Sequence, residues 1–348
     1  MNYRRLAGVL IAMGLVLAVA GAASAEGLLD KNLHYFAPTV DGSGLIVSYG
    51  SEPLGMFRMA YGVYADVAMD VLDYAAPPDG DEATLISTQA AAQLVYSIGF
   101  WKYVNVGFGL SYIPYRQFDD AFFDEEYPHP DADLNPDLPG TNLSDDEGLG
   151  DPTEETGLED VRLDLKLIGI DRQERCIGAA LITTFGYPLS YKPNQFLSDG
   201  GATIAPRLVV DFGRTWYTLV FNGGYKYYAE KSRVRLPDYS EEIDSPTNGD
   251  LETNDEIMLG GGAKFRFAYG SEIILDSQFR TQATDAFGDD RVDYGEVMAA
   301  YRKYFRGLNY TALTVGGGIG VMDGMGTPLG RFFIGITRDE KRLYIAGR

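Results

Sequence analysis

The residues best suited to metal chemistry lie in one acidic stretch of the chain. Oxygen-bearing side chains recur there at every second position: Asp131, Asp133, Asn135 and Asp137. This spacing is typical of a calcium-binding loop. However, Pro136 replaces the glycine of the sharp turn, and Asn142 stands where the bidentate glutamate belongs. The sequence leaves open a weak calcium site and a generic acidic loop, and a milder possibility is that divalent cations bridge this loop to anionic surface lipid. No other cofactor is expected.

The acidic stretch is longer than this motif. Residues 114–157 contain 14 acids and a single base, Arg116. A charge block that also contains Pro and Gly predicts a solvated loop. The whole chain has a net charge of −21, which argues against nucleic acid as a partner, because phosphates are bound by clustered Lys and Arg.

Catalytic chemistry finds little support in the sequence. The two histidines are His34, which precedes the first predicted strand, and His129, which lies in the acidic loop. Without a histidine in a strand, a lipid-facing Ser–His pair of the barrel-phospholipase type cannot form. His129 could imitate an omptin-like protease site, but any histidine in this loop would have acidic neighbours. Cys176 is the single cysteine and is interpreted as a small packing residue. We predict that the chain is not an enzyme.

The strongest signal is a strict alternation of side-chain character. Between residues 57 and 71, apolar residues such as Val63 and Val67 occupy one parity, while Arg58, Asp66 and Asp70 occupy the other. Successive side chains of a strand point to opposite faces, so this pattern predicts a strand with one apolar and one charged face. The predicted strands are 57–73, 85–98, 102–113, 158–169, 175–187, 202–212, 215–228, 256–268, 271–283, 293–304, 309–320 and 329–338.

The connections between these segments favour a transmembrane barrel over a soluble β-domain. Short and long connections alternate along the chain, as in bacterial outer-membrane barrels with short periplasmic turns and long extracellular loops. Aromatic residues such as Trp101 and Trp216 lie beside the short turns, and Tyr112 and Tyr227 lie at the opposite strand ends. Two such belts are typical of a membrane barrel. We predict an all-β, transmembrane, antiparallel up-and-down barrel of about 12 strands (10–14).

The charged parity of these strands is predicted to line the barrel interior. Its members are Arg58, Asp66, Asp70, Arg162, Asp164, Lys166, Arg207, Asp211, Lys226, Glu256, Lys264, Arg266, Glu272, Asp276, Arg280, Glu296, Arg302 and Arg331. Eight are acids and ten are bases, so we expect cross-strand ion pairs, because unpaired buried charges are costly. About eight strands fill their own lumen and 16–18 leave a channel, so twelve predict at most a narrow conduit.

The ends of the sequence predict export. Arg4 and Arg5 precede an apolar run, and Ala23-Ser24-Ala25 forms a cleavage site, which is the pattern of a secretory signal peptide. We expect a signal peptide (1–25), a periplasmic N-terminal segment that could partly plug the lumen (26–56), the barrel (57–338) with its extracellular loop (114–157), and a periplasmic tail (339–348). The predicted location is the outer membrane, reached through the Sec pathway, with both termini periplasmic.

Several motifs resemble a known family. They are the run from Gly157 to Lys166, Phe185-Gly186-Tyr187-Pro188, the run from Phe196 to Gly201, and the run from Ala205 to Asp211. These resemble outer-membrane β-barrel transporter-like proteins of the phenol-degradation (meta-pathway) type, especially the barrel half of delta-proteobacterial proteins with a C-terminal peptidoglycan-binding domain. The resemblance implies a channel or transporter without catalytic residues. The few residues after Thr337 lead us to expect the barrel without that added domain.

Two functions remain open on the sequence. The first is a narrow channel or transporter for small-molecule solutes. The second is a structural or surface-interaction barrel with a closed, ion-paired lumen and acidic extracellular loops. In either case the expected partners are outer-membrane lipid, lipopolysaccharide and the barrel-assembly machinery.

Overall fold

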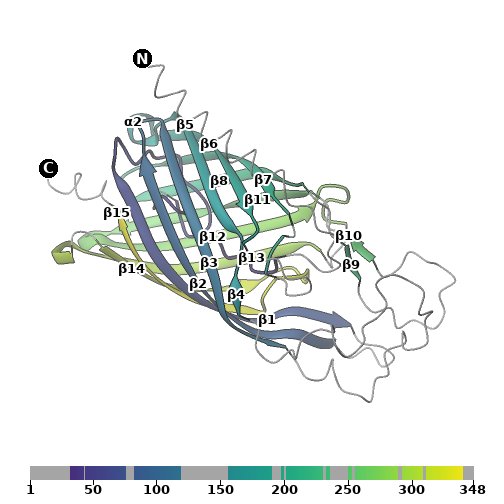
Figure 1. Ribbon diagram of the computed structural model, residues 1–348. Helices are drawn as coiled ribbons and strands as arrows, with labels where there is room; N and C mark the ends of the chain where they lie inside the picture. The colour runs from purple at the N-terminus through teal and green to yellow at the C-terminus, as the bar shows by residue number, and fades with distance from the viewer. Residues whose placement is uncertain are drawn as a thin grey trace, which may run out of the picture.

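The computed structural model consists almost entirely of antiparallel strands that form one closed barrel (Figure 1). It describes residues 32–42, 44–75, 82–118, 156–189, 197–199, 201–229, 233–235, 250–252, 255–288, 292–308 and 311–339. The barrel strands are β1 (Met59–Ala75), β2 (Glu82–Gly99), β3 (Val104–Phe118), β5 (Val161–Ile170), β6 (Ile177–Tyr187), β7 (Thr203–Gly213), β8 (Tyr217–Tyr228), β11 (Glu256–Phe267), β12 (Ser271–Gln282), β13 (Tyr294–Phe305), β14 (Thr311–Gly320) and β15 (Gly330–Asp339).

Closure results from β1, which pairs with both β2 and β15. Val63, for example, lies opposite Leu94 on β2 and Ile336 on β15. Every barrel strand therefore has two neighbours, so none of the described barrel strands is an edge strand of an open sheet. The predicted twelve-stranded antiparallel up-and-down barrel is confirmed.

The remaining regular elements are short. They are β4 (Gly157–Leu158), the small hairpin of β9 (Arg233–Arg235) and β10 (Asp250–Glu252), the helix α2 (Arg172–Arg175), and the 3-10 turns η3 (Ala268–Gly270) and η4 (Arg306–Leu308). No helix among the described residues is both long and apolar enough to cross a membrane.

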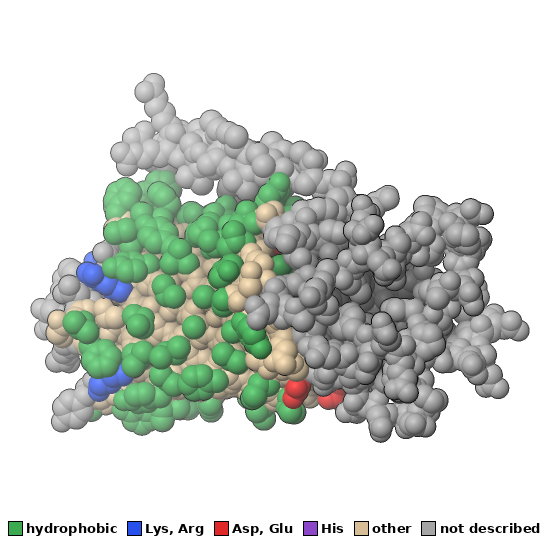
Figure 2. Space-filling view, turned by 60° about the horizontal axis from the view of Figure 1, so that its bottom comes forward, with side chains coloured by type: hydrophobic (Ala, Val, Ile, Leu, Met, Phe, Trp, Pro, Cys, Tyr) green, Lys and Arg blue, Asp and Glu red, His purple; other side chains and the backbone are tan. Residues whose placement is uncertain are grey.

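The strand faces follow the predicted alternation over most of the barrel. On β1, Val63 is 54% exposed, whereas Asp66 is 2% exposed. Figure 2 shows hydrophobic side chains spread over the described part of the outer wall. The alternation breaks at Asp70, where φ is +49° and the pairing with β2 shifts register. Val71, predicted for the outer face, consequently points inward and is buried.

A second bulge lengthens β3 beyond its predicted end at residue 113. The register with β2 shifts between Ala90 and Ala92, and the strand continues to Phe118. Pro114 falls in this irregular stretch, where a residue without an N–H group is tolerated. Arg116, assigned to the acidic loop by its charge, therefore belongs to β3, where it is fully buried and donates to Gln89.

The two ends of the barrel differ in their connections. One end has the short links, including η3 and η4, and the other has the longer connections, with the β9–β10 hairpin beyond it (Figure 1). Trp101 and Trp216 are exposed at the short-turn end, and Tyr112 and Tyr227 are exposed toward the opposite end. The outer surface thus has aromatic residues near both rims.

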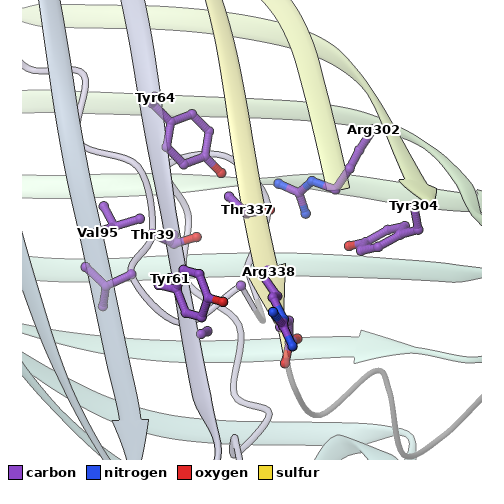
Figure 3. A pocket seen from close by; sticks show the side chains of 12 residues that line it. Thr39, Tyr61, Tyr64, Val95, Arg302, Tyr304, Thr337 and Arg338 are labelled. Carbon is purple, nitrogen blue, oxygen red and sulfur yellow. The ribbon is translucent and has the colours of Figure 1, made fainter. Parts of the chain in front are cut away.

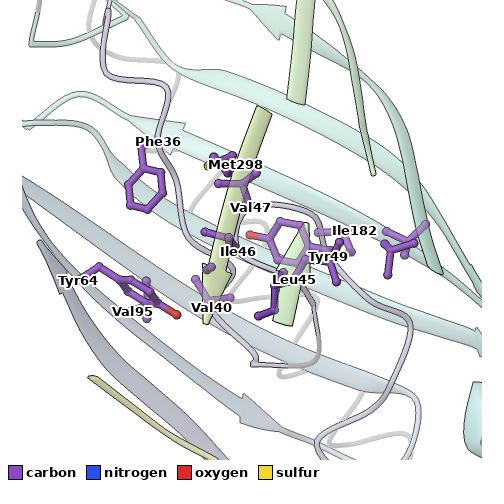
Figure 4. Packing of buried hydrophobic residues seen from close by; sticks show 14 of the residues in the cluster. Phe36, Val40, Leu45, Ile46, Val47, Tyr49, Tyr64, Val95, Ile182 and Met298 are labelled. Atoms are coloured by element: carbon purple, nitrogen blue, oxygen red, sulfur yellow. The ribbon is translucent and has the colours of Figure 1, made fainter. Parts of the chain in front are cut away.

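Residues 32–42 and 44–56, here called the inner segment, run inside the barrel without helix or strand structure. Leu33 lies near Gly326 at the end with the long connections, and Glu52 reaches Arg172 at the short-turn end. Leu45, Ile46 and Val47 are buried among apolar wall residues (Figure 4). The segment therefore extends from one end of the barrel to the other.

Close packing around this core makes one prediction about stability. A Cβ atom at Gly316 on β14 would lie 2.5 Å from both Cζ of Phe333 and the carbonyl oxygen of Ala299. We expect Gly316→Ala to destabilise the barrel by about 1–3 kcal/mol, because the backbone must shift. The measurement is the temperature at which the compact, unboiled gel band is lost.

The matched control is Gly307→Ala, where a Cβ atom would meet nothing within 4 Å. This variant should keep the wild-type temperature. Equal losses in the two variants would contradict the packing argument.

Candidate functional site

The charged residues that the alternation assigned to the interior wall fall into two groups, which are buried and half-buried in the structure. The buried group consists of Asp66, Asp164, Lys166, Asp211, Lys226, Glu256, Lys264, Glu272, Asp276, Glu296, Arg302 and Arg331. The half-buried group consists of Arg58, Asp70, Arg162, Arg207, Arg266 and Arg280. Asp70 occupies the bulge of β1 instead of a regular inward position.

Some of these residues pair with one another between different strands of the wall. Arg331 bridges Asp66 at 2.5 Å and Glu296 at 2.9 Å. Glu272 is shared by Arg266 at 2.9 Å and Arg302 at 3.7 Å. Buried charges persist only when they are paired and hydrogen-bonded, so these bridges keep the wall charged and closely packed.

Other wall charges bind partners outside the regular strands. Lys166 lies 2.5 Å from Asp41 of the inner segment, and Lys226 lies 2.6 Å from Asp199 in the connection between β6 and β7. At the short-turn end, Arg172 of α2 pairs with Glu52. The wall thus includes ion pairs that tie the inner segment to the barrel.

His34 forms the anchor nearest the start of the described chain. Its Nδ1 atom lies 3.0 Å from Glu159, and its Nε2 atom lies 3.1 Å from Asp66. Burial alone would lower the pKa of His34, but the charges and hydrogen bonds of Glu159 and Asp66 raise this pKa to about 9. His34 is therefore a buried cation at neutral pH, held between two carboxylates.

One wall carboxylate binds three successive peptide groups of the inner segment. Asp276 on β12 accepts hydrogen bonds from the backbone N–H groups of Ile46 and Val47 at 2.8 Å, and of Ser48 at 3.1 Å. A carboxylate that accepts several backbone donors makes strong, charge-assisted bonds. Asp276 therefore fixes the middle of the inner segment through its main chain.

The peptide groups of the next residue, Tyr49, are bound by an amide side chain. Asn222 on β8 accepts from the N–H of Tyr49 at 2.9 Å and donates to the carbonyl of the same residue at 3.0 Å. The Tyr49 hydroxyl in turn donates to Asp164. Both the main chain and the side chain of this residue are thus satisfied by the wall.

Wall donors bind the carbonyl groups of the inner segment over most of its length. The bonds are Gln278 to Tyr35 (3.3 Å), Gln93 to Phe36 (2.7 Å), Arg162 to Pro38 (2.6 Å), Lys264 to Gly44 (3.1 Å), Arg302 to Leu45 (2.9 Å) and Lys166 to Glu52 (2.9 Å). Further along, Asp211 accepts from the N–H of Ser51 at 3.0 Å and Asn105 accepts from that of Leu54 at 3.3 Å.

Two small cavities lie beside the inner segment. One cavity of about 20 Å³ lies between the segment and the wall near Tyr64 and Arg302 (Figure 3). Another of about 30 Å³ lies beside Ser48 and Asn222. Each has room for roughly one or two water molecules. In this state neither cavity could hold a larger solute.

Sequence reasoning missed the partners that the inner segment and the connections supply. His34, Asp41 and Glu52 follow no strand period, and Asp199 lies in a connection. Their signal is weak, a mixture of polar and apolar residues with no alternation. No group of three or more His, Cys, Asp or Glu residues within the described ranges could hold a metal ion. The calcium candidates Asp131, Asp133, Asn135 and Asp137 lie outside the described residues, as does His129.

Comparison with known proteins identifies solved structures but no sequence family. No family model matches the chain, and no curated protein matches it. An outer membrane channel from Pseudomonas putida F1 is 10% identical, with a TM-score of 0.55, over 83% of this chain and 97% of that one. A Pseudomonas aeruginosa FadL homologue is 9% identical, with a TM-score of 0.43, over 91% and 100%. The similarity to the first supports the fold.

The raised pKa of His34 predicts a pH-dependent stability. The folded protein binds the His34 proton more tightly than the unfolded chain, so the stabilisation is complete below about pH 6.5 and is lost as pH rises through about 9. Its upper limit is roughly 3 kcal/mol. In urea unfolding followed by tryptophan fluorescence, we expect wild type to lose this stability between those pH values and His34→Gln not to do so. Parallel pH profiles for the two proteins would contradict the assignment.

Because Asp276 accepts from three N–H groups of the inner segment, we predict that its replacement destabilises the fold and loosens residues 46–48. Asp276→Ala should destabilise the fold by about 1–3 kcal/mol, because it removes the acceptor from buried N–H groups. Amide hydrogen exchange at residues 46–48 should also accelerate. Asp323→Ala is the control, since Asp323 is exposed. Unchanged exchange at residues 46–48 would show that Asp276 does not hold the segment.

Proposed function

We propose that this protein is an outer-membrane channel for small molecules and that the inner segment is its gate. The observation that supports this most directly is the division of the barrel wall into an apolar outer face and a charged inner face. Val63 and Leu208 are more than half exposed outside, whereas Asp276 and Lys264 are buried inside. Transmembrane barrels have this division, because lipid surrounds them and their interior is polar.

The two ends of the barrel suggest an orientation. Outer-membrane barrels place short turns in the periplasm and long loops outside, so the end with η3 and η4 would face the periplasm. Both β1 and β15 meet that end, since Ala60 pairs with Asp339. Periplasmic termini, a cleaved signal peptide and contact with lipid and lipopolysaccharide complete this proposal. The Pseudomonas putida protein of similar fold is an outer membrane channel, which agrees with it.

Gating follows from how the inner segment is held. It contributes no strand to the barrel, so it could move without breaking the pairing that closes the wall. Its hydrogen bonds and ion pairs run mainly to wall side chains such as Asp276, Asn222 and Lys166, and these side chains are not part of the backbone pairing between strands. Displacement of residues 44–52 would uncover the charged wall along the middle of the lumen.

The filled lumen also favours a second function. If the inner segment never leaves, the protein is a closed structural or surface-interaction barrel. The cavities of about 20 and 30 Å³ beside the segment favour this alternative. Conductance separates the two functions, because a permanently filled barrel passes no ions.

A reversible disulfide lock tests the gate directly. A Cβ atom built at Gly260 would lie 3.2 Å from Oγ of Ser48, and a disulfide requires Cβ atoms about 3.5–4.5 Å apart. In a Cys176→Ser background, Ser48→Cys combined with Gly260→Cys should cross-link the segment to β11. We expect the oxidised protein to show no conductance in a planar bilayer and the reduced protein to regain it.

Each single-cysteine variant serves as a control and should conduct under both conditions. Heat-modifiable gel mobility should establish folding of every variant. Equal conductance of the oxidised and reduced double variant would contradict the gate. Absence of conductance in wild type and in all folded variants would favour the closed structural barrel.

A further inference from the structure

The interior wall binds the inner segment through its main chain as well as through its side chains. Wall side chains accept from several N–H groups between Ile46 and Leu54 and donate to several carbonyl groups between Tyr35 and Glu52. Polar contacts to its side chains include those of His34, Asp41, Tyr49, Ser51 and Glu52. Contacts to peptide groups do not depend on the sequence of the bound chain, and main-chain bonds supply affinity in peptide-binding proteins generally.

The middle of the wall combines donors and acceptors in the pattern that a peptide needs. Over three consecutive residues Asp276 accepts three N–H groups, and Asn222 then accepts and donates at the same residue. Lys264 donates to the carbonyl of Gly44 and Arg302 to that of Leu45, the two residues that precede Ile46. An amide side chain that pairs with both groups of one residue reproduces the pairing of a neighbouring strand.

Branched apolar side chains are accommodated beside this polar surface. Ile46 and Val47 belong to one buried cluster with Val209, Val220 and Ile274 of the wall. A peptide with apolar side chains up to the size of isoleucine could therefore fit where the inner segment now lies. An apolar solute could not replace the segment, because the acceptors and donors of the wall would lose their partners at a high cost.

We propose that the lumen wall is a binding surface for short peptides and that the inner segment occupies it as an internal substitute ligand. This inference rests on the proposed function, because it names the solute class of the same channel. A peptide that replaces the segment exchanges each hydrogen bond for one of the same kind. It therefore compensates the loss of the segment's contacts and shifts the equilibrium toward the open state.

Two isomeric tripeptides test this inference in the full-length protein. Trialanine and trisarcosine have the same atoms and both are zwitterions, but the amide nitrogens of trisarcosine carry methyl groups and cannot donate to Asp276 or Asn222. In proteoliposomes, we expect trialanine to enter about threefold to tenfold faster than trisarcosine, the effect of about one hydrogen bond. The oxidised Ser48→Cys, Gly260→Cys protein measures passage outside the channel.

Asn222→Ala provides the variant test. It should lower the ratio of the two rates toward one, with the remaining preference supplied by Asp276, even if loosening of the inner segment raises both rates. Gln117→Ala is the matched control, because the Gln117 amide is exposed and pairs with Tyr115; it should keep the wild-type ratio.

The possible failures are distinguishable. Equal entry of the two tripeptides through a protein that conducts ions would overturn the peptide inference and leave the channel intact. A wild-type ratio in both Asn222→Ala and Asp276→Ala would likewise overturn it, because the preference would then arise elsewhere. Absence of both ion conductance and tripeptide entry in the folded, reduced protein would overturn the channel and the inference together.

Discussion

Peptide groups that are buried away from water must find hydrogen-bond partners, and this constraint shapes the whole molecule. In the wall it is met by strand pairing, and closure between β1 and β15 removes the last open edges. In the interior it is met by side chains, because the inner segment forms no strand. Asp276 and Asn222 are the clearest cases, since they satisfy four successive N–H groups from Ile46 to Tyr49.

The same constraint explains why the interior is charged although it is filled. A lysine or arginine that binds a peptide carbonyl still needs a counter-charge nearby, and the wall supplies carboxylates on neighbouring strands. Arg302 shows both roles, with a bond to the Leu45 carbonyl and an ion pair to Glu272. Removing one member of such a group leaves an uncompensated buried charge, which is strongly destabilising. The network therefore holds the segment and stabilises the barrel at once.

Much of the wall could be predicted from the sequence, because strand faces repeat with a period of two. Val63 and Asp66 reveal the outer and inner faces of β1 from their spacing alone. The prediction failed at bulges, which no periodicity reveals: Val71 turns inward after Asp70, and Arg116 joins β3. The inner segment could not be built from the sequence either. His34 meets Glu159 across 125 positions, and no local pattern encodes such a distant contact.

The central claim is that residues inside the barrel become accessible when the channel opens. It is tested most directly by Ser48→Cys in the Cys176→Ser background, because residue 48 is only 3% exposed in this structure. A membrane-impermeant thiol reagent is applied during planar-bilayer recording. The account predicts modification only while the channel conducts, with a lasting change in current. Steady conductance without any modification of residue 48 would contradict it.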